Sequence, residues 1–225
     1  MLTEGHDALG VVCDVTNAAD VRALAKAAQR AGPPRALAHV VGLSPSMADA
    51  GAILRVDLVG ATLVADAFFE FVQPGAAAVF IASLAPHVSE LDQALKDAIE
   101  EPLAPGLLER VEAACAGDIS PGIAYSLAKL GVIRLCQRRA GSWGQKGARI
   151  LSISPGLIAT PMGAREFKAQ TTKHQLLETT PLGREGTMIE IAEVVDFLLS
   201  ERASYISGID LLVDGGLAAA IHHKA

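Results

Sequence analysis

The chain has 225 residues, of which 51% are hydrophobic and 20% are charged, and its net charge is −6. This size and composition predict one globular domain over residues 1–225 with a full hydrophobic core, and they exclude a disordered chain. The negative charge argues against a nucleic-acid partner. No apolar run approaches the roughly 18 residues that a membrane span needs, so we expect no membrane partner.

The cysteines and histidines indicate neither a disulfide framework nor a metal site. Cys13, Cys115 and Cys136 are odd in number and widely spaced, as is typical of reduced thiols. The six histidines do not fall into metal-ligand spacings. The first residues also lack the basic and apolar pattern of a targeting segment. We therefore expect a cytoplasmic protein with no bound metal.

Short apolar runs alternate with helical patterns along the chain. The predicted strands are Ala8–Val15, Ala36–Val41, Ala76–Ala82, Arg149–Ser154 and Ile209–Val213. The predicted helices are Ala18–Ala31, a stretch that ends near Val72, a helix that ends near Trp143, and Met188–Leu199. Strands that alternate with helices predict an α/β fold with a parallel sheet and helices on both faces.

The segment Leu84–Pro121 differs from the rest, because it is acidic and is interrupted by prolines. Its pattern predicts one or two short amphipathic helices. Its two ends lie next to Ser83 and Tyr125, so we expect the segment to lie over the carboxyl-end face of the sheet.

Several residues follow directly after predicted strands. Ligands of parallel sheets bind outside the carboxyl ends of the strands. The residues at those positions are Asp14, Gly42, Ser83, Pro155 and Gly156. Their shared position predicts a single site.

Tyr125 and Lys129 lie four residues apart on a predicted helix, and therefore on the same face. An ammonium close to a phenol favours the phenolate form. Such a pair can exchange a proton with an alcohol or carbonyl oxygen. A tyrosine and a lysine at this spacing, taken by themselves, are more often only part of a helix surface. The rest of the chain therefore decides between a surface helix and a catalytic pair.

The ordered set of motifs resembles the short-chain dehydrogenase/reductase family. The matching pieces cover residues 8–216: Asp14-Val15, Ser83 after a strand, the Tyr125–Lys129 pair, Ala148–Thr160, Pro181–Gly186 and Ala203–Gly216. The resemblance implies a Rossmann-like, doubly wound sheet. It also implies an NAD(P)-dependent oxidoreductase that interconverts a secondary alcohol and a ketone. The partners it implies are a small-molecule substrate and further copies of the chain, in a homodimer or homotetramer.

The resemblance also implies roles for single residues. Tyr125 would transfer the proton, Ser83 would bind the substrate oxygen, and Lys129 would act on Tyr125 and hold the nicotinamide ribose. The remaining cofactor residues would be Asp14 and Val15 at the adenine, Gly42 near the adenine ribose, and Pro155, Gly156, Ile158 and Thr160 at the nicotinamide.

The sequence departs from the family pattern in three main places. The glycine-rich strand–helix–strand unit that would hold the dinucleotide phosphates does not precede Ala8. Asp57 stands where the family has an asparagine, so a role for Asp57 in proton relay would use a carboxylate. Leu84–Pro121 is an insertion between the serine and the tyrosine, and would wall the substrate pocket or alter a subunit interface.

Two alternatives to an active oxidoreductase remain open at this point. The first is a truncated relative with an incomplete dinucleotide site and weak or absent NAD or NADP binding, and the second is a cofactor-free enzyme. A cofactor-free enzyme of the halohydrin dehalogenase type would carry an arginine in place of Lys129. The absent unit would also leave one edge of the strand Ala36–Val41 unpaired. We expect either Ala8–Val15 or a neighbouring subunit to cover that edge.

Overall fold

A parallel sheet of four strands organises the molecule. The computed structural model describes residues 8–169 and 172–223. The strands lie in the order β1 (Ala36–His39), β2 (Ala77–Ile81), β3 (Arg149–Pro155) and β6 (Asp210–Val213). All three pairings are parallel, so the carboxyl ends of the strands meet at one edge of the sheet.

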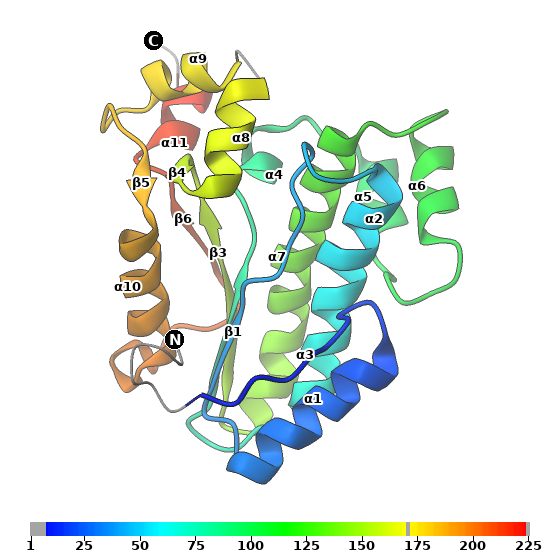
Figure 1. Ribbon diagram of the computed structural model, residues 1–225, viewed down its shortest axis with the longest axis vertical. Helices are drawn as coiled ribbons and strands as arrows, with labels where there is room; N and C mark the ends of the chain where they lie inside the picture. Colours follow the sequence, from blue (N-terminus) through cyan, green and yellow to red (C-terminus); the bar gives the residue numbers. More distant parts are fainter. Residues whose placement is uncertain (1–7, 170–171, 224–225) are drawn as a thin grey trace.

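Helices cover both faces of this sheet (Figure 1). On one face lie α1 (Ala18–Ala31), the π-helix η2 (Leu54–Gly60) with α2 (Ala50–Ile53) before it and α3 (Ala61–Phe69) after it, and α7 (Pro121–Gln145). On the other face lies α10 (Met188–Leu199). The strand side chains alternate accordingly: Phe80 and Ile150 pack with Val132 of α7, and Leu151 and Ile153 pack with Leu198 of α10. The expected doubly wound α/β fold is confirmed.

Polar side chains fix the beginnings of the main helices. The Asn17 side chain accepts hydrogen bonds from the amides of Ala19 and Asp20 at the start of α1. Thr187 and Glu190 form a reciprocal capping box at the start of α10. The predicted helices Ala18–Ala31 and Met188–Leu199 therefore have the predicted bounds, and α7 ends two residues after the predicted Trp143.

The predicted strand Ala8–Val15 is wrong. These residues form no strand, and the side chain of Leu9 is 76% exposed. An apolar, β-branched run becomes a buried strand only where a neighbouring strand pairs with its backbone. Within residues 8–169 and 172–223 no strand pairs with this segment or with the outer edge of β1. The expected pairing of Ala8–Val15 with β1 is therefore also wrong.

The insertion Leu84–Pro121 is helical, as predicted, but most of it lies elsewhere than expected. It forms α4 (Ala85–Val88), α5 (Gln93–Ala98) and α6 (Leu107–Ala114). Leu95, Ile99 and Val111 pack in one cluster with Leu58 of η2 and Leu127 of α7. The helices α5 and α6 therefore cover the outer side of α2 and α7, and only α4 lies beside the carboxyl ends of the strands (Figure 1).

The rest of the chain closes one end of the sheet. The short strands β4 (Ile158–Ala159) and β5 (Gly186–Thr187) pair with each other. Around them lie α8 (Pro161–Ala169), α9 (Thr172–Thr179) and α11 (Leu217–His222). The 3-10 turn η3 (Glu201–Ala203) follows α10 at the opposite end of the sheet, where Glu201 pairs with Arg35 just before β1. In the part of the chain that the structure describes, no helix is both long and apolar enough to cross a bilayer.

Candidate active site

Ser83 lies directly after β2, at the carboxyl-end edge of the sheet. The amides of Ala82 and Leu84 on either side of it donate to the carbonyl oxygens of Ile153 and Pro155, at 2.8 and 2.9 Å. These two bonds extend the pairing of β2 with β3 past the end of β2. The Ser83 Oγ accepts a hydrogen bond from the amide of Ala85 at 3.1 Å. The hydroxyl is thus fixed at the start of α4.

The Lys129 side chain connects α7, which carries Tyr125, to the end of β2, which Ser83 follows. Its Nζ lies 5.6 Å from the centre of the Tyr125 ring, one turn earlier on α7. The same Nζ donates to the carbonyl oxygen of Ile81, the last residue of β2, at 3.2 Å. Ser83 follows two residues later. The structure therefore brings the predicted serine, tyrosine and lysine to one place.

Asp57 pairs directly with Lys129. Its Oδ2 lies 3.2 Å from the Lys129 Nζ, and the two side chains are 0% and 6% exposed. The other carboxylate oxygen accepts from the amide of Leu43 at 2.8 Å. Burial raises the pKa of Asp57, while the charge of Lys129 and the Leu43 amide act in the opposite direction. The Asp57 carboxylate thus contacts Lys129 directly, and its role in proton relay stays a prediction.

Gly42 packs against this ion pair. A Cβ atom at position 42 would lie 3.0 Å from the Lys129 Nζ and 3.1 Å from the Asp57 Oδ2. Such contacts are too close for most side chains, so the absence of a side chain leaves room for the pair. A role for Gly42 at the adenine ribose stays a prediction.

His39 is a residue of the site that the sequence analysis missed. It is the last residue of β1, is 5% exposed, and packs against Phe80 with the ring centres 5.1 Å apart and the rings tilted by 38°. Burial, and then the charge of Lys129, lowers the pKa of His39 to about 4, so the ring is neutral at pH 7. The Nε2 atom is buried and has no hydrogen-bond partner among the described residues. The sequence feature that could have indicated His39 is its position within an apolar predicted strand, three residues before Gly42.

The predicted nicotinamide loop is tied to the neighbouring strand β6. The amide of Gly156 donates to the carbonyl oxygen of Val213 at 3.0 Å. A Cβ at Gly156 would lie 2.7 Å from the Cα of Asp214. Thr160 accepts from the amide of Gly163 at 2.9 Å and thereby caps α8. Ile158 lines a cavity of about 100 Å³ beside Asp214. The loop that begins at Pro155 is therefore rigidly placed at the carboxyl ends of β3 and β6.

Asp14 and Val15 lie apart from these residues. The Asp14 carboxylate accepts from the Thr16 amide and hydroxyl at 2.9 and 2.8 Å, and these bonds lower its pKa. Val15 packs against Gly60 at the end of η2. Among the described contacts, none joins Asp14 to Ser83, Tyr125 or Lys129. The local bonds give Asp14 a role in the turn before α1, and its adenine role stays a prediction.

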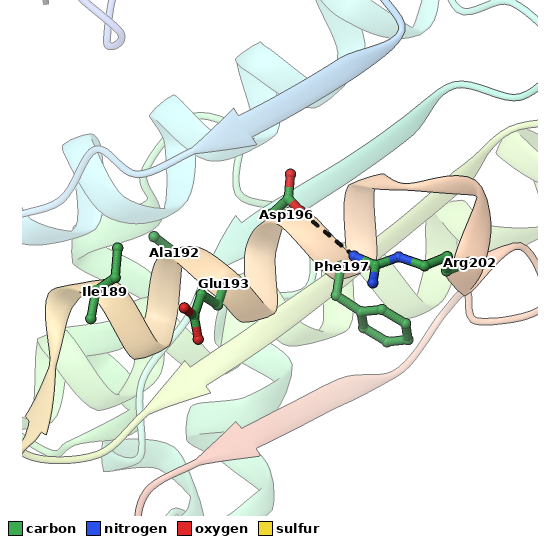
Figure 2. Close-up of a pocket in the computed structure, with 6 residues that line it drawn as sticks. All are labelled: Ile189, Ala192, Glu193, Asp196, Phe197 and Arg202. Atoms are coloured by element: carbon green, nitrogen blue, oxygen red, sulfur yellow. Dashed lines mark ion pairs between the residues drawn. The ribbon is translucent and has the colours of Figure 1, made fainter.

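A larger hollow lies on the outer face of α10 and is separate from the candidate site. This groove has a volume of about 510 Å³, and Figure 2 shows the residues that line it. They are Ile189, Ala192, Glu193, Asp196, Phe197 and Arg202. Asp196 and Arg202 form an exposed ion pair at 3.7 Å, and no residue of the candidate site takes part. The groove therefore adds nothing to the chemistry of Ser83, Tyr125 and Lys129.

The fold and the site together define a Rossmann-like enzyme whose serine, tyrosine and lysine lie at the carboxyl ends of a parallel sheet. Comparison with known proteins agrees with this class. Residues 112–218 match the family model described as Enoyl-(Acyl carrier protein) reductase. The 3-alpha-hydroxysteroid dehydrogenase/carbonyl reductase of Comamonas testosteroni is 32% identical over 185 residues, which cover 79% of this chain and 70% of that protein.

A solved structure shows the same fold. The 3-alpha-hydroxysteroid dehydrogenase from Pseudomonas sp. B-0831, complexed with NADH, superposes with a TM-score of 0.79 and 26% identity, over 96% of this chain and 85% of that one. This chain belongs to the short-chain dehydrogenase/reductase family.

The share of each relative that this chain covers differs from one relative to another. An uncharacterized short-chain type dehydrogenase/reductase of Sinorhizobium fredii is 33% identical over 94% of this chain, but the match covers only 35% of that protein. The chain thus spans about a third of that relative and 70% of the Comamonas testosteroni protein.

Proposed function

We propose that Ser83, Tyr125 and Lys129 interconvert a secondary alcohol and a ketone, with NAD or NADP as the hydride partner. The observation that carries this proposal is the position of the Lys129 ammonium, between the Tyr125 ring and the end of β2, which Ser83 follows two residues later. A small-molecule alcohol or ketone is the substrate class. The proposal includes a cytoplasmic location and a homodimer or homotetramer.

Each side chain has a distinct task in this proposal. The Tyr125 hydroxyl gives a proton to the substrate oxygen or takes one from it. Ser83 accepts the Ala85 amide, which leaves its own hydrogen to donate to the substrate oxygen. That donation positions the oxygen and stabilises its developing charge. Lys129, held by Asp57 and Ile81, places a positive charge beside the tyrosine.

The residues present fit one half of a dinucleotide better than the other. Lys129 and the loop from Pro155 to Thr160 fit the nicotinamide half, because both lie at the carboxyl ends of the strands. When bound, the nicotinamide would supply or accept the hydride. No glycine-rich turn links a strand to a helix beside β1 in the described residues, so these residues offer no cradle for the phosphates.

A second candidate is a relative with an incomplete dinucleotide site and little or no turnover. The exposed, unpaired segment Ala8–Val15 and the open edge of β1 favour it. A cofactor-free enzyme of the halohydrin dehalogenase type is disfavoured, because Lys129 occupies the place of the arginine that such an enzyme uses.

Calorimetric titration with NADH and with NADPH separates the two candidates. We expect weak or absent binding by this 225-residue chain, despite its serine, tyrosine and lysine. Micromolar binding would show that other residues supply the phosphate contacts, and the incomplete-site candidate would fall. Turnover of secondary alcohols at high dinucleotide concentration tests the chemical step separately. No turnover at any concentration would remove the oxidoreductase proposal.

A further inference from the structure

The segment Ser83–Ser89 is held at two points, and these contacts have no part in the roles proposed so far. The segment leaves the end of β2, forms α4 and then continues into the insertion. The inference that follows rests on the proposed function, since it concerns how Ser83 is placed relative to Tyr125.

The first contact fastens α4 to the sheet. His87 Nε2 lies 2.8 Å from Asp210 Oδ2, and the Asp210 side chain is 6% exposed. Ser152 and Ser154 of β3 also donate to the Asp210 carboxylate, at 2.6 and 2.8 Å. Both carboxylate oxygens are therefore occupied, and the aspartate cannot turn away without breaking buried bonds. In addition, the His87 carbonyl oxygen accepts from His222 of α11 at 2.8 Å.

The second contact fastens the same segment to the tyrosine helix. The Ser89 hydroxyl donates to the carbonyl oxygen of Ala85 at 2.8 Å. Its oxygen lies 2.9 Å from the Ser126 oxygen. A hydroxyl has one hydrogen to donate, so Ser126 is the donor to Ser89. Ser126 is buried and directly follows Tyr125 in α7.

We propose that these two contacts form a clamp, made of His87 on Asp210 and Ser89 on Ser126, that sets the position of the Ser83 hydroxyl relative to Tyr125. His87 and Ser126 are then positioning residues of the site. The clamp holds the serine loop against β3 and β6 on one side and against α7 on the other. A reacting group that is misplaced by about 1 Å can lose roughly 100-fold in rate, so a modest release of the clamp is measurable.

The kinetic test uses Ser126→Ala with Ser142→Ala as its matched control. Both changes remove one serine hydroxyl from α7, and that of Ser142 only bonds the Arg139 carbonyl oxygen at 2.9 Å. We expect Ser126→Ala to lower kcat by about 10- to 100-fold with KM within about 2-fold, and Ser142→Ala to change neither. In a Ser83→Ala background the same Ser126→Ala change should cost nothing more. Full additivity of the two losses, or an unchanged kcat in Ser126→Ala, would overturn the proposal.

Asp210→Asn tests the other half of the clamp. It keeps the shape of the side chain but weakens the contact with His87, so it should also lower kcat and lose its effect in the Ser83→Ala background. A loss that persists unchanged in that background would mean that Asp210 acts on the fold and not through Ser83.

A measurement that needs no turnover tests the clamp independently of the proposed function. The chain has two tyrosines, so fluorotyrosine labelling gives two NMR signals, and Tyr205→Phe identifies that of Tyr125. We expect Ser126→Ala to move the Tyr125 signal and to speed hydrogen exchange of the Leu84 and His87 amides, whereas Ser142→Ala does neither. If both observables stay unmoved, the clamp is wrong even in an inactive chain. If they move and turnover is absent, only the proposed function fails.

Discussion

The region around α7 and the region of α10 with the outer edge of β1 differ in how fully their side chains are buried. On the side of α7, the groups around the end of β2 are buried and joined by hydrogen bonds, as in the Lys129–Asp57 pair with side chains 6% and 0% exposed. On the side of α10 and the outer edge of β1, apolar side chains face outward, and Ile189 is 64% exposed. The contacts that place the substrate-side chemistry lie within the chain, while the outer face of α10 and the outer edge of β1 stay uncovered among the described residues.

This difference bears on our proposal that a serine, a tyrosine and a lysine coexist with an incomplete dinucleotide site. Positions held by contacts between β2, β3, η2 and α7 do not depend on what adjoins β1. A phosphate cradle requires a helix N-terminus or a glycine-rich turn beside the strands, and it therefore depends on that open side. Each of the following predictions tests one side of this comparison.

The largest expected effect is on the substrate side. Tyr125→Phe removes only a hydroxyl, and we expect it to lower kcat by about 100- to 10,000-fold while the free energy of unfolding stays unchanged. The measurement is steady-state turnover in a preparation that first shows activity. Tyr205→Phe is the control, because Tyr205 is fully exposed and lies outside the site. A retained kcat in Tyr125→Phe would remove the central role assigned to this tyrosine.

The second prediction compares the two faces of α10. Leu198→Ala removes a side chain buried against β2 and β3, and we expect a loss of about 2–5 kcal/mol in the free energy of unfolding. Ile189→Ala, on the outer face shown in Figure 2, should cost less than about 0.5 kcal/mol. Urea unfolding of both variants measures the difference. An equal loss in Ile189→Ala would mean that the outer face is covered in solution.

The third prediction concerns His39 and acid. Its folded-state pKa is lowered to about 4 from 6.5, so below pH 6.5 the unfolded chain binds a proton that the folded chain does not. The stability linked to His39 is therefore fully present above pH 6.5 and decreases as the pH falls towards 4, by about 3 kcal/mol at most. His39→Leu should remove this part of the acid sensitivity. Identical pH slopes of unfolding free energy in the two proteins would contradict the buried, neutral histidine.

The smallest expected effect tests packing within α7. At Gly131 an added Cβ would lie 2.5 Å from the Leu58 Cδ1, so Gly131→Ala should destabilise the protein by about 1–3 kcal/mol. At Gly141, ten residues later in the same helix, nothing lies within 4 Å of the added atom. Gly141→Ala should stabilise by about 0.5–1 kcal/mol through helix propensity. If both substitutions have the same sign in denaturant unfolding, η2 and α7 do not pack as closely as described.

The local order of strands and helices could be predicted from the sequence wherever a segment carries its own signals. The helix α10 has a capping box at its start and an apolar stripe, and its bounds were predicted to the residue. Ser83, Tyr125 and Lys129 could also be named as candidates, since the serine follows an apolar strand, helical spacing relates the other two, and the family resemblance gives all three their expected roles. These features depend on residues close together in the chain.

Other features depended on partners that lie far away in the chain. Ala8–Val15 has the composition of a strand, yet it stays unpaired because a strand forms only where a neighbouring backbone offers hydrogen bonds. The neutral state of His39 and the fit of Gly42 against Lys129 and Asp57 follow from the burial of four segments in one place. The same holds for the contact of His87 with Asp210, which joins residues 123 positions apart. Local sequence thus determined most of the elements and suggested the three candidate catalytic residues, and tertiary packing alone decided that Ala8–Val15 forms no strand and which polar groups meet beside the sheet.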